Sequence, residues 1–210
     1  KKLKCRFKRI RLTPKGKADE ELYDVRRQML GLLEMQSEAG RIDLFYGDES
    51  QVAESGYVPY GWVFEDEVVE IPAQRGKAVN IWGLLCRDNR FVFSTTYNTI
   101  DADFILQHLD SFSFNLQKPT VVVLDNASIH TAQKVKERLQ VWQNRGLFIF
   151  YLPPYSPHLN IIERLWKELK ARWITPADYT STDRLFYAVY LALATVGTDL
   201  SIAFSKFNGN

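Results

Sequence analysis

The sequence predicts an α/β fold built on a mixed five-stranded sheet that is flanked by helices. Two features of the 210-residue chain lead to this prediction. Three apolar, strand-like segments come early and are joined by turns, and a regular alternation of strand and helix patterns follows them. Strands joined by short turns pair antiparallel, whereas strands connected through helices pair parallel by right-handed crossovers. The chain is therefore expected to contain both kinds of strand pair.

An amphipathic helix comes before the first strand. Residues 18–39 carry apolar side chains at helical spacing, and Gly40 ends the helix. The apolar positions are Leu22, Val25, Met29, Leu32 and Leu33. Strands are then expected at residues 42–46, 78–86 and 91–96, with a hairpin of residues 62–64 and 68–71 between the first two. Asp88 and Asn89 favour a turn between the last two strands.

Strands and helices alternate in the second part of the chain. Two short runs of apolar residues, 120–124 and 147–152, are expected to form buried strands. Helices are expected at residues 101–116, 131–144 and 181–196. This order of elements is the one that a ribonuclease-H-like α/β fold has, with five strands in one mixed sheet.

One further helix follows the turn YLPPYSPHLN, whose prolines can continue neither a strand nor a helix. Asn160 or Ser156 is expected to cap this helix, as Asp101 or Thr99 is expected to cap the helix before strand 120–124. Its apolar positions are Ile162, Leu165, Trp166, Leu169 and Trp173. The turn and the helix together should present the polar residues of this stretch at the end of strand 147–152.

Positive charge is concentrated at the start of the chain. Residues 1–17 contain nine of the 27 Lys and Arg residues and no acid, which leaves 18 basic against 25 acidic residues in the remainder. Such an asymmetry predicts a basic arm that lies on a polyanion, although a solubilising tail is the alternative. We expect residues 1–40 to form this arm and the amphipathic helix, and residues 41–210 to form the main α/β domain. The phosphate contacts of the arm would come from Lys4, Arg6, Lys8, Arg9 and Arg11.

Cysteine content and hydropathy favour a cytoplasmic protein without membrane association. Two cysteines, Cys5 and Cys86, are too few to indicate a disulfide framework. The basic start is not followed by the apolar core of a signal peptide. The longest apolar stretch, residues 185–196, is interrupted and much shorter than a membrane span. Because the chain starts at Lys1 rather than at Met, we expect a segment upstream of it.

Three carboxylates stand at comparable places in the predicted fold. Asp48 comes just after the first strand, Asp125 just after the fourth, and Glu163 in the first turn of the helix after the fifth. Functional groups of open α/β sheets gather at strand ends. If the first and fourth strands are neighbours, the three side chains meet, with Glu49 as an equally suitable acid beside Asp48. Their mutual repulsion favours a divalent cation, and hard oxygen ligands suit Mg²⁺ or Mn²⁺. Two such ions, roughly 3.5–4 Å apart, would support displacement at phosphorus.

Simpler interpretations of the same residues exist. Asp125 followed by Asn126 is a common turn sequence, and Glu163 could pair with Lys167 four residues later on a helix surface. Lys167 and Lys170 share the face of Glu163, so they form a basic row that leads away from it and could contact DNA.

Three segments that contain these acids resemble one family. FYGDES, VVVLDNASIH and LPPYSPHLNIIERLW are similar to the catalytic core of mariner-type DDE transposases, especially their bacterial insertion-sequence branch. Thirty-seven residues separate Asp125 from Glu163, near the mid-thirties spacing of that family. The last segment departs from the family pattern SPDLNPIE-x-LW at His158 and Ile161, which replace Asp and Pro. The resemblance covers residues 42–173.

The resemblance implies a set of site residues, a cofactor and partners. Asp48, Asp125 and Glu163 would be the catalytic, metal-binding acids, holding two Mg²⁺ or Mn²⁺ ions. The residues that would support these acids or face the substrate are Glu49, Asn126, His130 and Asn160. For His130 a plain place at a helix start is an equal alternative. The partners would be double-stranded DNA, as transposon ends and target, and a second copy of the chain in a homodimer.

The implied activity is metal-dependent cleavage of DNA at transposon ends, followed by joining of the 3′ ends to target DNA. Members of the family usually carry helix-turn-helix modules before this domain, and the basic arm would then be the linker between the two. The implied location is the bacterial cytoplasm, in association with the nucleoid. Two alternatives remain: a ribonuclease-H-fold nuclease without strand transfer, and a domesticated DNA-binding protein without turnover.

Overall fold

The computed structural model describes residues 20–54, 68, 77–205 and 207. The basic arm, with Lys4, Arg6, Lys8, Arg9 and Arg11, lies outside the described residues, and so does the expected hairpin except for Val68. Across the described ranges, no helix combines the length and the apolarity needed to cross a bilayer.

Five strands form one mixed sheet, as the sequence predicts. They are β1 (Asp43–Ala53), β2 (Ala78–Leu85), β3 (Phe91–Thr96), β4 (Thr120–Leu124) and β5 (Leu147–Tyr151). Their spatial order is β3-β2-β1-β4-β5. The first three strands pair antiparallel, whereas β1 with β4 and β4 with β5 pair parallel. The central position of β1 between an antiparallel and a parallel neighbour confirms the expected mixture.

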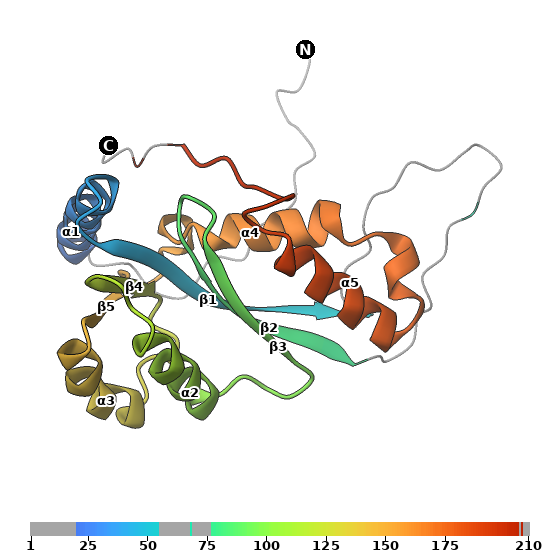
Figure 1. Cartoon of the computed structure of the whole chain (residues 1–210), viewed down its shortest axis with the longest axis horizontal. Helices are drawn as coiled ribbons and strands as arrows, with labels where there is room; N and C mark the ends of the chain where they lie inside the picture. Colours follow the sequence, from blue (N-terminus) through green and yellow to red (C-terminus); the bar gives the residue numbers. More distant parts are fainter. Residues whose placement is uncertain (1–19, 55–67, 69–76, 206, 208–210) are drawn as a thin grey trace, which may run out of the picture.

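Helices cover both faces of the sheet (Figure 1). They are α1 (Glu20–Glu38), α2 (Ala102–Ser113), α3 (Gln133–Asn144), α4 (Ile162–Glu168) and α5 (Thr182–Ala194). One apolar core joins α2 and α3 to the sheet through Phe45 and Trp82. The other core joins α1, α4 and α5 to the opposite face through Leu44 and Tyr46. Successive strand residues point to opposite faces, so adjacent β1 residues belong to different cores.

β1 is longer than the sequence predicted, and this corrects the expected place of the first acid. The predicted strand ended at residue 46, but β1 continues to Ala53, so Asp48 lies inside it and opposite Gly83 of β2. Pairing with β4 reaches only Tyr46. Beyond that point β1 pairs, among the described strands, with β2 alone. No strand of the described part of the chain pairs with its other side there.

Gly47 is the first residue of β1 that no longer pairs with β4. A Cβ atom there would lie 2.7 Å from a Leu124 methyl carbon and 2.9 Å from a Leu84 methyl carbon. Real Cβ atoms do not come so close to their neighbours, because interiors are packed without spare volume. Gly47 therefore allows β1, β2 and the end of β4 to approach one another immediately before Asp48.

The predicted cap of α4 is wrong, whereas for α2 Asp101, one of the two predicted candidates, is confirmed. A 3₁₀ turn (Pro157–Leu159) precedes α4, and Ile161 stands at its N-cap position without a side-chain cap. Asn160 instead donates to the Gly47 carbonyl, over 3.1 Å. Asp101 caps α2 and Ser181 caps α5, each by accepting a backbone N–H bond. After Glu168 the helix widens into a π-helical segment (Leu169–Trp173).

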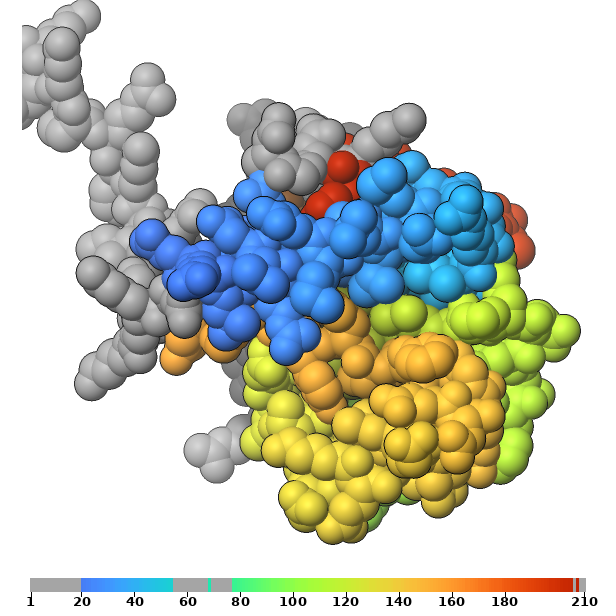
Figure 2. Space-filling view, turned by 90° about the vertical axis from the view of Figure 1, so that its left-hand side faces the viewer, coloured from blue at the N-terminus to red at the C-terminus, as the bar shows by residue number. Residues whose placement is uncertain are grey.

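The expected helix α1 is present, but its apolar stripe does not face the sheet. Leu22, Val25, Met29 and Leu32 are 41–60% exposed, whereas Leu30 is fully buried. In Figure 2, α1 lies along one side of the molecule as a surface ridge, drawn in blue. Sequence periodicity located the helix correctly and assigned the wrong face to the core.

A buried carboxylate fixes the orientation of α1. Glu34, only 4% exposed, accepts hydrogen bonds from Arg87 Nε at 2.8 and 2.7 Å and from the Tyr46 hydroxyl. Arg87 also donates to the carbonyl of Ser205, 2.9 Å away. This network joins α1, β1, the end of β2 and the C-terminal segment. A buried ion can be accommodated only when it is paired and hydrogen-bonded, so the network dictates which side of α1 turns inward.

We predict that Glu34→Ala lowers the free energy of unfolding by about 3–5 kcal/mol, because it leaves the Arg87 charge and the Tyr46 hydroxyl partly buried without their acceptor. Urea denaturation measures the change. Glu38→Ala, an exposed substitution in the same helix, serves as control and should change stability by no more than about 0.5 kcal/mol. Equal effects of the two substitutions would contradict the assigned role of Glu34.

Candidate active site

The three acids singled out in the sequence line one cavity. Asp48 comes from β1, Asp125 follows β4 directly, and Glu163 stands in the first turn of α4. The cavity has a volume of about 760 Å³, and Asn126 and Asn160 also line it. The acids gather there because β1 and β4 are parallel neighbours and the turn after β5 returns α4 over the end of β4.

Asp48 is the most perturbed of the three acids. Burial, followed by the negative charges of Glu49, Glu163 and Asp125, raises its pKa to about 7. The indole nitrogen of Trp166 donates to its Oδ2 at 3.1 Å and partly offsets this rise in pKa. Burial and the neighbouring carboxylates thus act in the same direction, because both disfavour the ionised form of Asp48.

Asp125 is held by two hydrogen bonds to the same oxygen. Its Oδ1 accepts from the backbone N–H of Ala127 at 2.9 Å and lies 2.8 Å from His130 Nδ1. The first contact is the side-chain turn that the simpler interpretation of the sequence predicted. The second contact is the main reason that the pKa of Asp125 is lowered. Asp125 can therefore form the turn and also take part in the site, because its Oδ2 accepts neither of these hydrogen bonds.

His130 lies between two carboxylates. Its ring is fully buried, with Nδ1 facing Asp125 and Nε2 3.2 Å from Glu49 Oε2. The contact to Glu49 has the distance of an ion pair but not the alignment of a hydrogen bond, so both atoms remain without hydrogen-bond partners. Burial alone would lower the pKa of His130, but the two carboxylates outweigh it and raise the pKa to about 9. The ring therefore carries positive charge at neutral pH.

Glu163 and Lys170 face each other across the helix surface. Burial is the largest cause that raises the pKa of Glu163, and the charge of Lys170 opposes this rise. The pKa of half-buried Lys170 is lowered, chiefly by burial. The alternative ion pair between Glu163 and Lys167 does not occur among the described ion pairs. The predicted basic row is thus divided, because Lys170 turns to the acids and Lys167 lines a separate groove.

Two residues of the turn and α4 hold β1 in place. Asn160 donates to the backbone at Gly47, and Trp166, 3% exposed, donates to the side chain of Asp48. Trp166 was expected only as an apolar helix position. Its indole N–H was the available signal, because a buried tryptophan needs an acceptor and Trp166 lies three residues from Glu163 on the helix. Asn126 contacts backbone as well, by donating to the Leu152 carbonyl.

The donor set of the cavity fits a divalent cation, although its acids are not gathered as closely as in a loaded metal site. Within the described ranges, no three His, Cys, Asp or Glu side chains are gathered as a metal site. Four carboxylates nevertheless converge, and the buried Oε2 of Glu49 accepts no hydrogen bond. Oxygen donors with uncompensated negative charge are what Mg²⁺ and Mn²⁺ require. Asp48, Asp125 and Glu163 are the residues that would bind such an ion.

Fold and site together define an α/β protein of ribonuclease-H-like fold with a carboxylate cavity at the end of its central parallel strands. Residues 43–185, more than half of the chain, match the family model of the DDE superfamily endonucleases. The chain belongs to this family. No curated protein sequence matches it.

Solved structures of the Mos1 mariner transposase share the fold. In the strand transfer complex the TM-score is 0.51 at 14% identity, over 93% of this chain and 67% of that chain. The paired-end complex with the left transposon end gives 0.50 at 15% identity, over 91% and 64%. The paired-end complex with Mn gives 0.51 at 16% identity, over 94% and 69%. This chain thus spans about two thirds of those chains, and the ribonuclease-H-like fold predicted from the sequence is confirmed.

We predict that the stability of the metal-free domain falls as pH rises from 5 to 9. The pKa of Asp48 is raised to about 7 in the folded state from 3.8, so its stabilising protonation is lost as pH rises through 7. The pKa of His130 is raised to about 9 from 6.5, so its contribution is lost as pH rises through 9. Urea denaturation in EDTA measures this fall.

Asp48→Asn is the matched variant for this pH series, since it removes the lower of the two titrations. Its stability should change little between pH 5 and 6.5 and fall only above that range. A wild-type stability that stays constant or rises with pH would contradict both shifts. The lowered pKa of Asp125 acts only in more acidic solution and does not disturb the comparison.

We predict that Trp166→Phe weakens Mn²⁺ binding by roughly 10–100-fold, because Asp48 loses the hydrogen bond that orients it and favours its ionised form. Isothermal titration with Mn²⁺ measures the affinity. Trp142→Phe is the control: Trp142 is also buried and donates to a carboxylate, that of Asp110, but far from the cavity. An equal loss of affinity in both variants would show that Trp166 acts only through packing.

Proposed function

We propose that the chain is the catalytic domain of a DNA transposase, which cleaves DNA at transposon ends and joins the 3′ ends to target DNA. The observation that carries the proposal is the convergence of Asp48, Asp125 and Glu163, three acids from three family-like motifs, on one cavity. Family membership supports phosphoryl transfer as the reaction class. The similarity to the Mos1 complexes supports DNA as the partner.

The metal requirement is part of the proposal. Asp48, Asp125 and Glu163 would hold one or two Mg²⁺ or Mn²⁺ ions. The chemistry that such a pair supplies, when bound, is activation of a water or 3′-hydroxyl and stabilisation of the leaving oxygen at phosphorus. No covalent protein–DNA intermediate is required, since positioning and charge account for phosphoryl transfer of this kind.

The side chains around the acids prepare them for this reaction. His130 fixes the orientation of Asp125, and its positive charge offsets part of the repulsion that Asp125 and Glu49 would feel together. Trp166 and Asn160 fix Asp48 and the backbone before it. Lys170 places a positive charge beside Glu163. Asp48 is the one acid of the three that must release a proton near neutral pH before it can bind a cation.

A homodimer and a bacterial, nucleoid-associated setting complete the proposal, and both rest on the sequence motifs alone. The alternatives are a nuclease of the same fold without strand transfer and a DNA-binding protein without turnover. Retention of all three acids in one cavity favours an enzyme over the second alternative.

We predict that Asp125→Asn and Glu163→Gln reduce Mg²⁺- or Mn²⁺-dependent DNA nicking to background while the domain stays folded. Asparagine keeps an acceptor for His130, so the loss would reflect the charge that a cation needs rather than a damaged loop. Nicking of supercoiled DNA measures the effect, and Glu137→Gln, on the exposed surface of α3, is the control with full activity. Nicking that persists in Asp125→Asn would remove this residue from the mechanism.

A second assay separates the enzymatic alternatives. A labelled, pre-cleaved duplex with a free 3′-hydroxyl is incubated with wild-type protein, metal ion and plasmid target. Covalent joining of the label to the plasmid is the expected result for a transposase. Nicking without any joined product would identify a simple nuclease. The absence of both nicking and joining would favour the non-catalytic alternative.

A further inference from the structure

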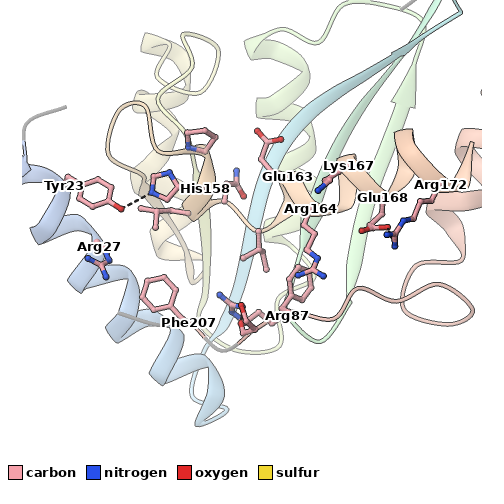
Figure 3. Close-up of a pocket in the computed structure, with 16 residues that line it drawn as sticks. Tyr23, Arg27, Arg87, His158, Glu163, Arg164, Lys167, Glu168, Arg172 and Phe207 are labelled. Atoms are coloured by element: carbon pink, nitrogen blue, oxygen red, sulfur yellow. Dashed lines mark hydrogen bonds and ion pairs between the residues drawn. The ribbon is translucent and has the colours of Figure 1, made fainter. Parts of the chain in front are cut away.

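A second, larger groove lies beside the cavity of the acids. Its walls are α1, the turn of residues 157–161, α4 and the C-terminal segment, and its volume is about 1110 Å³ (Figure 3). Tyr23 of α1 and His158 of the turn meet at one side of it, with Oη and Nε2 2.9 Å apart. The volume exceeds the usual range for small-molecule pockets, which indicates an extended ligand.

The lining of the groove is rich in positive charge that the protein does not neutralise. Its cationic side chains are Arg27, Arg87, Arg164, Lys167 and Arg172, against the two acids Glu163 and Glu168. Arg87 is paired with Glu34, and Arg172 with Glu168. The other three cations take part in none of the ion pairs found in the described part of the chain.

Arg27 supplies a second indication of a missing ligand. Its Nη2 is buried and has no hydrogen-bond acceptor, which is costly for a charged donor. Arg27 lies on the α1 side of the groove and Arg164 extends from α4 on the other side (Figure 3). An anion between the two helices would satisfy donors from both.

The groove adjoins the cavity of the acids. Pro157, His158, Asn160 and Glu163 line both of them. Arg172 stands nine positions after Glu163 in the helical segment, which at the usual rise of an α-helix is roughly 13 Å. This length is several times the axial rise of about 3.4 Å per nucleotide of one DNA strand, so the groove can contact more than one phosphate.

We propose that this groove binds the phosphodiester backbone of the DNA strand that leads away from the scissile phosphate, with Arg27, Arg164 and Lys167 as phosphate contacts. The inference rests on the proposed function, and it names the surface and the side chains by which the domain holds its substrate. The half-buried rings of Phe204 and Phe207 at the C-terminal wall add apolar surface suited to sugars and bases.

The test is DNA binding in EDTA, where no turnover occurs. Fluorescence anisotropy of a labelled duplex across a salt series gives the affinity and the slope of log K against log salt. The double variant Arg164→Gln with Lys167→Gln should bind several-fold more weakly and lose about two from the magnitude of the slope, about one per phosphate contact removed. Both side chains are exposed, so the variant should keep the thermal midpoint of the wild type.

Two control variants make the result specific. Lys136→Gln with Arg184→Gln removes the same charge from exposed positions on α3 and α5, and should leave the slope unchanged. Arg164→Lys with Lys167→Arg keeps both charges in the groove and should retain the wild-type slope. Arg27→Gln should add a further loss of about one to the double variant.

An unchanged slope in the groove variant, or a change no larger than in the charge-matched control, would overturn the inference. Because binding is measured without metal ion, this outcome does not depend on cleavage. Wild-type protein that fails to cut DNA but shows the expected slopes would remove the proposed activity and keep the groove as a DNA site. If the wild type cuts DNA and the groove variant has the same salt slope as the wild type, the proposed activity stands and the groove is not a DNA site.

Discussion

β1 has eleven residues and β4, its parallel neighbour, has five, and this difference in length places the whole site. At the end of β4 the chain leaves the sheet with Asp125, while β1 continues for several residues on the support of β2 alone. The side of β1 that β4 no longer covers is therefore open to α4. Asp48 lies on that part of β1, and Glu163 approaches it from α4. Without the difference in length, backbone pairing would occupy the space in which the acids meet.

Convergence of like charges is unfavourable, and the domain limits its cost in two ways. First, the buried imidazolium of His130 lies between Asp125 and Glu49. Second, the indole N–H of Trp166 donates a hydrogen bond to Asp48. Asp48 nevertheless keeps a raised pKa, first through burial and then through the charges of Glu49, Glu163 and Asp125. Glu34 of α1, on the face of the sheet that α4 also covers, is different: Arg87 and Tyr46 donate hydrogen bonds to it, so it serves the packing of α1.

Much of the fold could be predicted from hydrophobic patterns. Strands 91–96 and 120–124 and the cap Asp101 follow from local sequence, and the structure has them where they were expected. The extension of β1 could not be predicted in this way, because its polar residues after Gly47 look like a turn until β2 is placed beside them. The buried face of α1 was missed for a related reason. It is set by the ion pair of Glu34 with Arg87, 53 residues away, and not by the apolar stripe.

The convergence of the three acids was predicted from the motifs. The order and spacing of the motifs located Asp48, Asp125 and Glu163, and the structure brings them to one cavity. What sequence alone could not supply is the direction of the supporting side chains. The sequence pattern predicts Asn160 as a helix cap, but its side chain donates a hydrogen bond to the Gly47 carbonyl of β1. The pattern predicts Trp166 as a core residue, but its indole N–H also donates a hydrogen bond to Asp48. Each depends on a partner more than a hundred residues away in the chain.

Gly47 has a consequence for the substitutions that the site tolerates. A Cβ atom at this position would lie 2.7 Å from a Leu124 methyl carbon and 2.9 Å from a Leu84 methyl carbon, so a change to alanine requires those side chains to move, immediately before Asp48. A substitution at Gly47 can therefore disturb the packing beside Asp48 while all three acids stay in the sequence. A comparison of related sequences that inspects the acids alone would overlook such a change, and Gly47 is the residue that it should inspect as well.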